Sequence, residues 1–146
     1  MTEGASTHRP APAASGPARA FTPLVGITTL GIFLQAVTAG EFVSQRQRDG
    51  WIDVHNVIAN VTLVAALAAA IVGVAAVRRA RPSAAWASAV LFVLLVVQVV
   101  IGHLITDGKQ DGWIGVHVPL AFVIFGITIW LSIRGAMARQ GRVPAE

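Results

Sequence analysis

Residues 84–106 read AAWASAVLFVLLVVQVVIGHLIT, a run of 23 residues that contains no Asp, Glu, Lys or Arg. A helix needs about 20 apolar residues to cross the hydrocarbon core of a bilayer, so this run has the length of a transmembrane span. Its apolar residues are continuous rather than alternating, which favours a helix over a strand. Because only helices and closed barrels satisfy their backbone in lipid, the run indicates a helical membrane protein.

Three further apolar runs of similar length surround this one. Together the four runs predict transmembrane helices at 22–43, 51–77, 84–106 and 112–134. The chain has 146 residues, of which 55% are hydrophobic and only 12% charged, whereas a soluble domain of average composition carries about 25% charged residues. We therefore expect one all-α integral membrane domain, a four-helix transmembrane bundle embedded in a lipid bilayer.

The two ends of the chain differ from the spans in composition. Residues 1–21 are rich in Ala, Pro, Ser and Thr, and such a segment cannot bury enough apolar surface to fold, so we expect a disordered cytoplasmic tail. The first apolar run exceeds the hydrophobic core of a signal peptide, which favours a span over a cleaved signal. Residues 135–146 are expected to form a cytoplasmic C-terminal tail.

The positions of Lys and Arg predict the orientation. Eight of the eleven basic residues lie in the two tails and in the loop between the second and third spans, and three lie in the other loops. Cytoplasmic loops carry an excess of Lys and Arg, so both termini are expected on the cytoplasmic side of the cell membrane. These charges form no basic face interleaved with aromatic residues, so no nucleic-acid partner is expected. The absence of cysteine excludes disulfides, thiolate metal sites and covalent c-type heme attachment.

An internal repeat divides the chain into two hairpins. The segment DGWIDVH at 49–55 returns as DGWIGVH at 111–117, with six of seven positions identical at an offset of 62 residues. Two spans return the chain to the side on which it began, so the two copies, about 22–77 and 84–134, are parallel and related by an axis along the membrane normal. Further matches are Ala59 with Ala121, Gly40 with Gly102 and, with a slip of one residue, Gln35 with Gln98.

The repeat places His55 and His117 at equal depth, about one turn below the outer surface. Ionisable side chains inside a membrane are costly and mark functional sites, and inward-pointing faces would bring these two imidazoles together across the bundle. The alternative is structural: a neutral interfacial histidine can bond a carbonyl or a water, and Asp-Gly-Trp can serve as a helix cap with an aromatic anchor.

Two facing imidazoles match the axial ligand set of a heme iron, and bundle cores are common sites for such cofactors. Zinc needs three or four protein ligands, which His103, Glu41 or Asp53 could complete, and copper binding and proton relay also remain open. The candidate residues around a heme fall into two groups. Small residues that leave room for the ring are Ala59, Ala121, Gly40 and Gly102, and loop cations that could pair with propionates, or simply be solvated, are Arg46, Arg48 and Lys109.

The sequence resembles one half of heme A synthase. The resemblance rests on Leu34-Gln35 leading to Gly40, on Val97-Gln98 leading to Gly102, and on the His-x-x-x-Ala start of the second and fourth spans. It covers about residues 22–134 and implies that His55 and His117 are the axial pair of a heme near the outer face. It also implies an acidic residue before the first histidine. The chain departs from that family in having four spans instead of eight and no cysteine pair.

Three functions follow as expectations. The leading one is a membrane heme-binding protein with a bis-histidine heme b, acting in electron transfer or heme handling. The second is a half-size heme A synthase-like enzyme acting as a homo-oligomer. The third is a cofactor-free accessory or scaffold subunit of a larger membrane complex. The expected protein partners are further copies of the chain or a respiratory or redox membrane complex. His103 is expected to be a partner of the ligands, an alternative ligand or an interfacial histidine bonded locally, and Glu41 is a further candidate partner.

Overall fold

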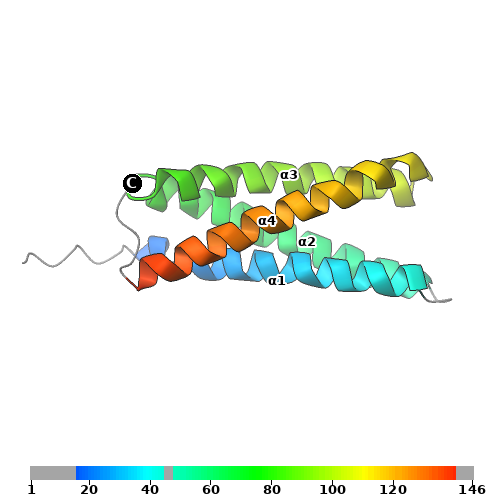
Figure 1. Ribbon diagram of the computed structural model, residues 1–146, viewed down its shortest axis with the longest axis horizontal. Coiled ribbons are helices and arrows are strands. Elements are labelled where there is room, and N and C mark those ends of the chain that lie inside the picture. Colours follow the sequence, from blue (N-terminus) through cyan, green and yellow to red (C-terminus); the bar gives the residue numbers. More distant parts are fainter. Residues whose placement is uncertain (1–15, 45–47, 141–146) are drawn as a thin grey trace, which may run out of the picture.

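The computed structural model describes residues 16–44 and 48–140, which form the four helices of Figure 1. These are α1 (Gly16–Ser44), α2 (Arg48–Val72), α3 (Pro82–Thr106) and α4 (Ile114–Arg139). A π-helical turn, η1 (Gly73–Val77), extends α2, and a 3-10 turn, η2 (Asp111–Trp113), leads into α4. No strand occurs in these ranges, and all four helices are long and apolar enough to cross a membrane. The expected all-α four-helix bundle is confirmed.

The helices form a closed ring of neighbours. Helix α1 packs against α2 and α4, and α3 packs against the same two helices, so α2 and α4 lie diagonally across the bundle. In Figure 1, α4 slants across the bundle, with its C-terminal end beside the start of α1 and its N-terminal end beside the end of α3. The diagonal position of α2 and α4 is the one that two residues facing each other across the bundle axis require.

Two helices extend beyond the sequence prediction by five residues or more. Helix α1 begins at Gly16, so residues 16–21, expected in the disordered tail, are helical, and Phe21 is only 1% exposed. Helix α4 continues to Arg139, five residues beyond the predicted end of its span. The extension of α4 packs against α1, because a Cβ on the buried Gly135 would lie 2.9 Å from the Thr22 side chain. The predicted tail residues 1–15 and 141–146 lie outside the described residues.

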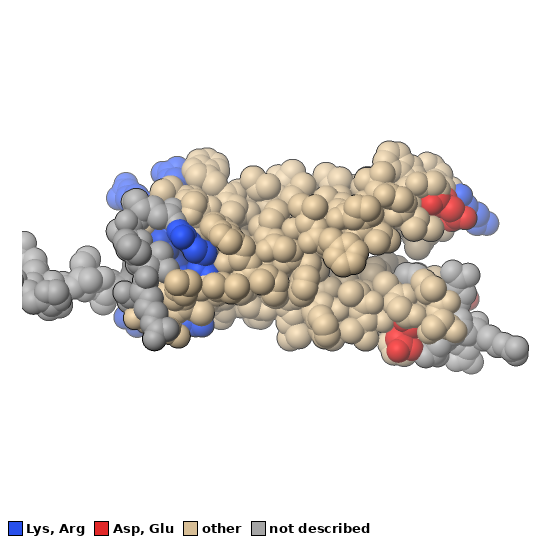
Figure 2. Space-filling model, in the orientation of Figure 1, with Lys and Arg blue, Asp and Glu red and all other residues tan. Residues whose placement is uncertain are grey.

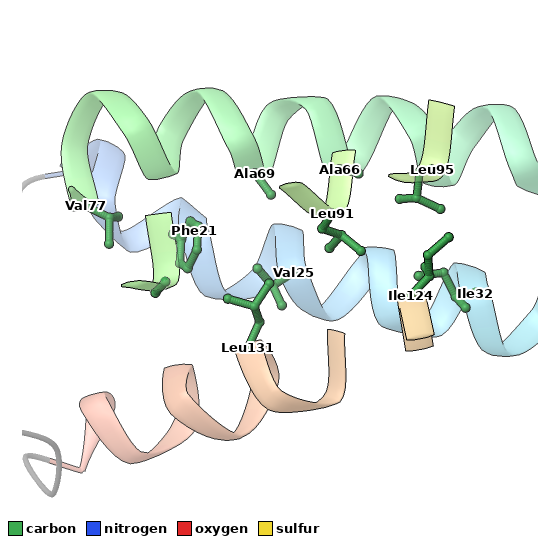
Figure 3. Packing of buried hydrophobic residues seen from close by; sticks show 11 residues of the cluster. Phe21, Val25, Ile32, Ala66, Ala69, Val77, Leu91, Leu95, Ile124 and Leu131 are labelled. Atoms are coloured by element: carbon green, nitrogen blue, oxygen red, sulfur yellow. The ribbon is translucent and has the colours of Figure 1, made fainter. Parts of the chain in front are cut away.

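The apolar core fills the part of the bundle nearest the chain termini. Figure 3 shows residues of all four helices meeting there, among them Val25, Ala69, Leu91 and Leu131. At the opposite end, which we call the acidic end, burial falls sharply. Among the residues whose burial is described in 33–61, 96–106 and 111–123, only Thr38 and Ile101 are buried. Figure 2 shows a notch in the surface at this end, between the α1–α2 pair and the α3–α4 pair.

The outer surface of the bundle is apolar along its length. Large side chains such as Phe122, which is 74% exposed, and Val64, which is 67% exposed, point outward. A soluble monomer rarely exposes such a continuous apolar surface, so length, composition and surface together indicate a multi-pass membrane protein. Figure 2 shows Lys and Arg mostly at the end that holds the chain termini, and Asp and Glu at the other end, with some blue atoms beside them.

The pattern of buried positions in α1 recurs in α3, and the pattern in α2 recurs in α4, but the two offsets differ by one residue. Each buried position of α1 recurs in α3 63 residues later, and each buried position of α4 repeats one of α2 at an offset of 62. The contacts repeat too: Gly73 of η1 lies against Ala85 of α3, and the equivalent Gly135 of α4 lies against Thr22 of α1. The one-residue slip between Gln35 and Gln98 is therefore the register of the first and third helices, and both glutamines bond the carbonyl of a histidine in the next helix.

This register corrects one pairing inferred from the sequence. In the structural register Gly102 is equivalent to Ala39, and Gly40 is equivalent to His103. The earlier pairing of Gly40 with Gly102 applied the offset of the second and fourth helices to the first and third. One residue turns a helix by about 100°, so the two glycines face different neighbours.

Candidate functional site

His55 is half-buried in the second turn of α2 and is held from α1 at two atoms. The Gln35 side-chain Nε2 donates to the carbonyl oxygen of His55 at 2.6 Å, and the Thr38 hydroxyl lies 2.9 Å from Nδ1 of the ring. Thr38 is 4% exposed, the most buried residue of α1 at the acidic end. Both the backbone and the ring of His55 are thus positioned by the neighbouring helix.

The Thr38 contact assigns the tautomer of His55. The Thr38 hydroxyl lies 3.0 Å from the carbonyl oxygen of Leu34 and 3.1 Å from that of Gln35, and both oxygens can only accept. We assign the single hydroxyl proton to these carbonyls, so that the hydroxyl oxygen accepts from Nδ1–H of His55, one of the two directions that the contact allows. In the neutral ring this arrangement leaves the lone pair on Nε2, the usual state of a metal-ligating histidine whose other nitrogen donates to a fixed partner.

His117 occupies the equivalent place on α4 but has a different ring environment. The Gln98 Nε2 donates to the carbonyl oxygen of His117 at 2.9 Å, as Gln35 does for His55. Ile101 replaces the threonine in the structural register. Nδ1 of His117 and Oε1 of Gln98 are consequently buried without a hydrogen-bond partner. The ring lies against Gly102, where a Cβ would be 3.5 Å from Cε1.

The two histidines lie at the same end of the bundle, on the diagonal helices α2 and α4, which make no helix–helix contact with each other in the described chain. This is the acidic end, where few side chains are buried. Two imidazoles at a sparsely filled end of a bundle are candidate ligands for one bound group.

The other residues expected around the site are placed unevenly. Ala59 and Ala121 are half-buried, one turn below their histidines. Gly102 contacts the ring of His117, whereas Gly40 is exposed and a Cβ there would meet nothing within 4 Å, so the structure does not place it against the ring region. Lys109 is exposed in the loop after α3 and has a left-handed backbone, with a φ of 52°. Arg46 and the side chain of Arg48 lie outside the described part of the chain.

The remaining polar candidates lie at the margin of this region. His103 is exposed, and its Nδ1 is 2.9 Å from the carbonyl oxygen of Val99, a bond within its own helix. Glu41 is half-buried in the last turn of α1, and Asp53 is exposed on the first turns of α2. Within residues 16–44 and 48–140, no three or more His, Asp or Glu side chains are grouped so that they could hold a metal ion.

Two kinds of contact with the histidines were not predicted from the sequence: the glutamine bonds to their carbonyls and the Thr38 contact with the ring of His55. The glutamines were recognised as repeated positions, but their bonds to the histidine carbonyls were not predicted. Thr38 was not singled out at all, because a threonine in a helix ordinarily bonds the carbonyl four residues earlier, as Thr28 and Thr62 do here. The one available signal was its position: Thr38 lies three residues after Gln35, nearly one helical turn, and so shares its face.

Comparison of this chain with protein-family models, with curated proteins and with solved structures finds no match. The resemblance to heme A synthase therefore depends on the short motifs themselves.

Proposed function

We propose that this protein binds one heme b through Nε2 of His55 and Nε2 of His117, between α2 and α4 at the acidic end of the bundle. The observation that carries the proposal is the pair of repeat-equivalent histidines at one end of the two diagonal helices, each with its carbonyl bonded to a glutamine. Two imidazoles are a complete protein ligand set for a six-coordinate heme iron. Zinc, in contrast, normally takes three or four protein ligands.

Four features of the residues at this end suit a heme: the tautomer of His55, the unbonded Nδ1 of His117, the small side chains near the histidines and a nearby cation. The Thr38 contact leaves the lone pair of His55 on Nε2. Nδ1 of His117 is a buried polar atom to which no neighbouring residue of the described chain offers a hydrogen bond. Gly102 and the two half-buried alanines, Ala59 and Ala121, keep side-chain volume low near the rings. Lys109 is exposed in the connection between α3 and α4 at this end, where a propionate would reach a cation.

The activity we propose is electron transfer or heme handling at one face of the cell membrane. A bound heme supplies one-electron chemistry, while the protein orients the cofactor and sets the basicity of its ligands. In the orientation predicted from the basic residues, both termini are cytoplasmic, and the histidines lie in the outer leaflet.

One asymmetry favours a second candidate, a half-size heme A synthase-like enzyme. Thr38 holds the ring of His55, whereas the ring of His117 lacks a hydrogen bond at Nδ1. His117 is therefore the more readily displaced ligand, and a displaceable ligand provides the open coordination position that a heme-modifying enzyme needs.

The test is a hemin titration of detergent-purified full-length protein, followed by absorption spectroscopy. The wild type and the matched control His103→Ala should give a low-spin, six-coordinate spectrum, because the His103 Nδ1 bonds its own helix. His55→Ala and His117→Ala should each abolish that spectrum. If both alanine variants kept it, the heme would be held elsewhere and the assignment of ligands would be wrong.

A further inference from the structure

Two buried polar atoms meet at the contact between Gln98 of α3 and His117 of α4. The Gln98 Nε2 donates to the carbonyl oxygen of His117 at 2.9 Å, and this bond joins the two residues directly. Oε1 of the same amide and Nδ1 of the same histidine are both buried and have no hydrogen-bond partner within the described chain. A buried polar atom left without a partner costs its full desolvation, so this contact favours a third group that bonds both atoms.

The first hairpin shows what such a group does. There the Thr38 hydroxyl lies 2.9 Å from Nδ1 of His55. In the structural register α3 has Ile101 in place of this threonine and Gly102 in place of the alanine that follows it. A Cβ on Gly102 would lie 3.5 Å from Cε1 of His117, the ring carbon bonded to Nδ1. The second hairpin has therefore lost the hydroxyl, and it has also lost a side-chain carbon next to the ring.

The chemistry of the two atoms defines the group that fits them. The amide oxygen of Gln98 can only accept a hydrogen bond, and a neutral histidine that uses Nε2 as a ligand carries its proton on Nδ1, which can then only donate. The group must therefore accept from one atom and donate to the other, as a water molecule does and a carboxylate or a cation does not. Buried waters typically bond polar groups that the protein leaves unpaired. The contact lies at the acidic end, where few described side chains are buried and water can enter.

We propose that one buried water molecule bridges Oε1 of Gln98 and Nδ1 of His117, in the role that the Thr38 hydroxyl has at His55. The water donates one proton to the amide oxygen and accepts from Nδ1–H, so that the lone pair of His117 is on Nε2. Gln98 is then a positioning residue for His117. This consequence rests on the proposed heme function, whereas the water site itself does not. Because a water exchanges and the Thr38 hydroxyl is part of a helix, His117 remains the more readily displaced of the two histidines.

The test is nuclear magnetic resonance of the full-length protein without heme, labelled with ¹⁵N at histidine, in lipid nanodiscs at a pH where the rings are neutral. The ring nitrogen shifts show which nitrogen carries the proton. Cross-relaxation between the ring N–H proton and water shows whether a water is bound there. We expect Nδ1–H at both His55 and His117, and a contact with water at His117 only.

Three variants separate the water from the other contacts. Gln98→Met removes both polar atoms of the amide, so the His117 proton should move to Nε2 and the contact with water should be lost. Gln35→Met is the matched control, because it removes the same bond to the carbonyl of His55 while Thr38 still holds Nδ1, and His55 should keep Nδ1–H. Ile101→Thr should displace the water and keep Nδ1–H. After loading with hemin, Gln98→Met should weaken affinity about tenfold or more.

Three results would overturn the proposal. A wild-type His117 with its proton on Nε2 would exclude the bridge, and Nδ1–H without a contact with water would mean that a protein group bonds it directly. An equal movement of the His55 proton in Gln35→Met would show that the carbonyl bond sets the tautomer. If Gln98→Met fails to fold, Ile101→Thr decides, because an unchanged contact with water in that variant would place the water elsewhere. A wild type that shows the bridge but never binds heme would contradict the proposed function alone.

Discussion

Replacing Thr38 by valine removes one hydroxyl from the site and leaves a side chain of nearly the same shape. The Thr38 oxygen lies 2.9 Å from Nδ1 of His55 in a position only 4% exposed, and we assign it as the acceptor of Nδ1–H. A buried donor left without its acceptor costs about 1–3 kcal/mol, and loss of the partner of a metal-ligating histidine weakens binding about 10–100-fold. Each 1.4 kcal/mol corresponds to about a tenfold change in affinity, so the energy range and the affinity range overlap. We therefore expect Thr38→Val to weaken heme affinity by about one to two orders of magnitude.

The same change should also alter the redox potential. A hydrogen bond from Nδ1–H makes the imidazole a more basic ligand, which favours the oxidised iron. Its removal in Thr38→Val should raise the midpoint potential by tens of millivolts, where a tenfold change in a one-electron equilibrium corresponds to about 59 mV. Hemin titration and spectroelectrochemistry of the purified variant measure the two effects separately.

Thr38→Ser is the matched control, because it keeps the hydroxyl and removes only a methyl group. It should retain most of the affinity and the wild-type potential. The reasoning would be refuted by a Thr38→Val variant that binds heme with unchanged affinity and potential. Equal impairment in Thr38→Ser would also refute it, because the effect would then come from packing. Thermal unfolding without heme shows whether either variant is simply less stable.

Two further predictions concern the bundle and its orientation. A Cβ on Gly31 would overlap the Thr62 side chain, so Gly31→Ala should destabilise the protein by about 1–3 kcal/mol, measured by denaturant unfolding in detergent. Gly26→Ala in the same helix meets open space and should be neutral or stabilising by up to about 1 kcal/mol; equal losses would contradict the packing. A cysteine at Ser44 should react with an impermeant thiol reagent from outside intact cells, and one at Ala80 should not. The reverse pattern would overturn the cytoplasmic termini.

The sequence predicted the four spans because each is a long apolar run bounded by charged residues. It also singled out His55 and His117, because a heptapeptide repeated at a fixed offset is a strong local signal. The start of α1 was missed because residues 16–21 share the Ala- and Pro-rich composition of the tail. Phe21 is buried only in the assembled bundle, where its ring lies against Gly73 of η1.

The register of the first and third helices could not be settled by the motif on the second and fourth. From Thr38 to His55 the chain takes one residue more than from Ile101 to His117, so the first hairpin has the longer connection. A single offset therefore misplaces every residue of α1 by about 100° around the helix axis. This is why Gly102, but not Gly40, lies against a histidine ring. The burial pattern along each helix reveals the difference, and burial depends on the assembled bundle.

The central claim is that two histidines at the acidic end hold one heme. The most direct measurement is the absorption spectrum of full-length protein purified in detergent, recorded first air-oxidised and then reduced with dithionite. We predict a Soret band that shifts on reduction, together with the sharp α and β bands of a six-coordinate, low-spin heme b. A protein that is colourless as purified and stays colourless after incubation with hemin would contradict the account.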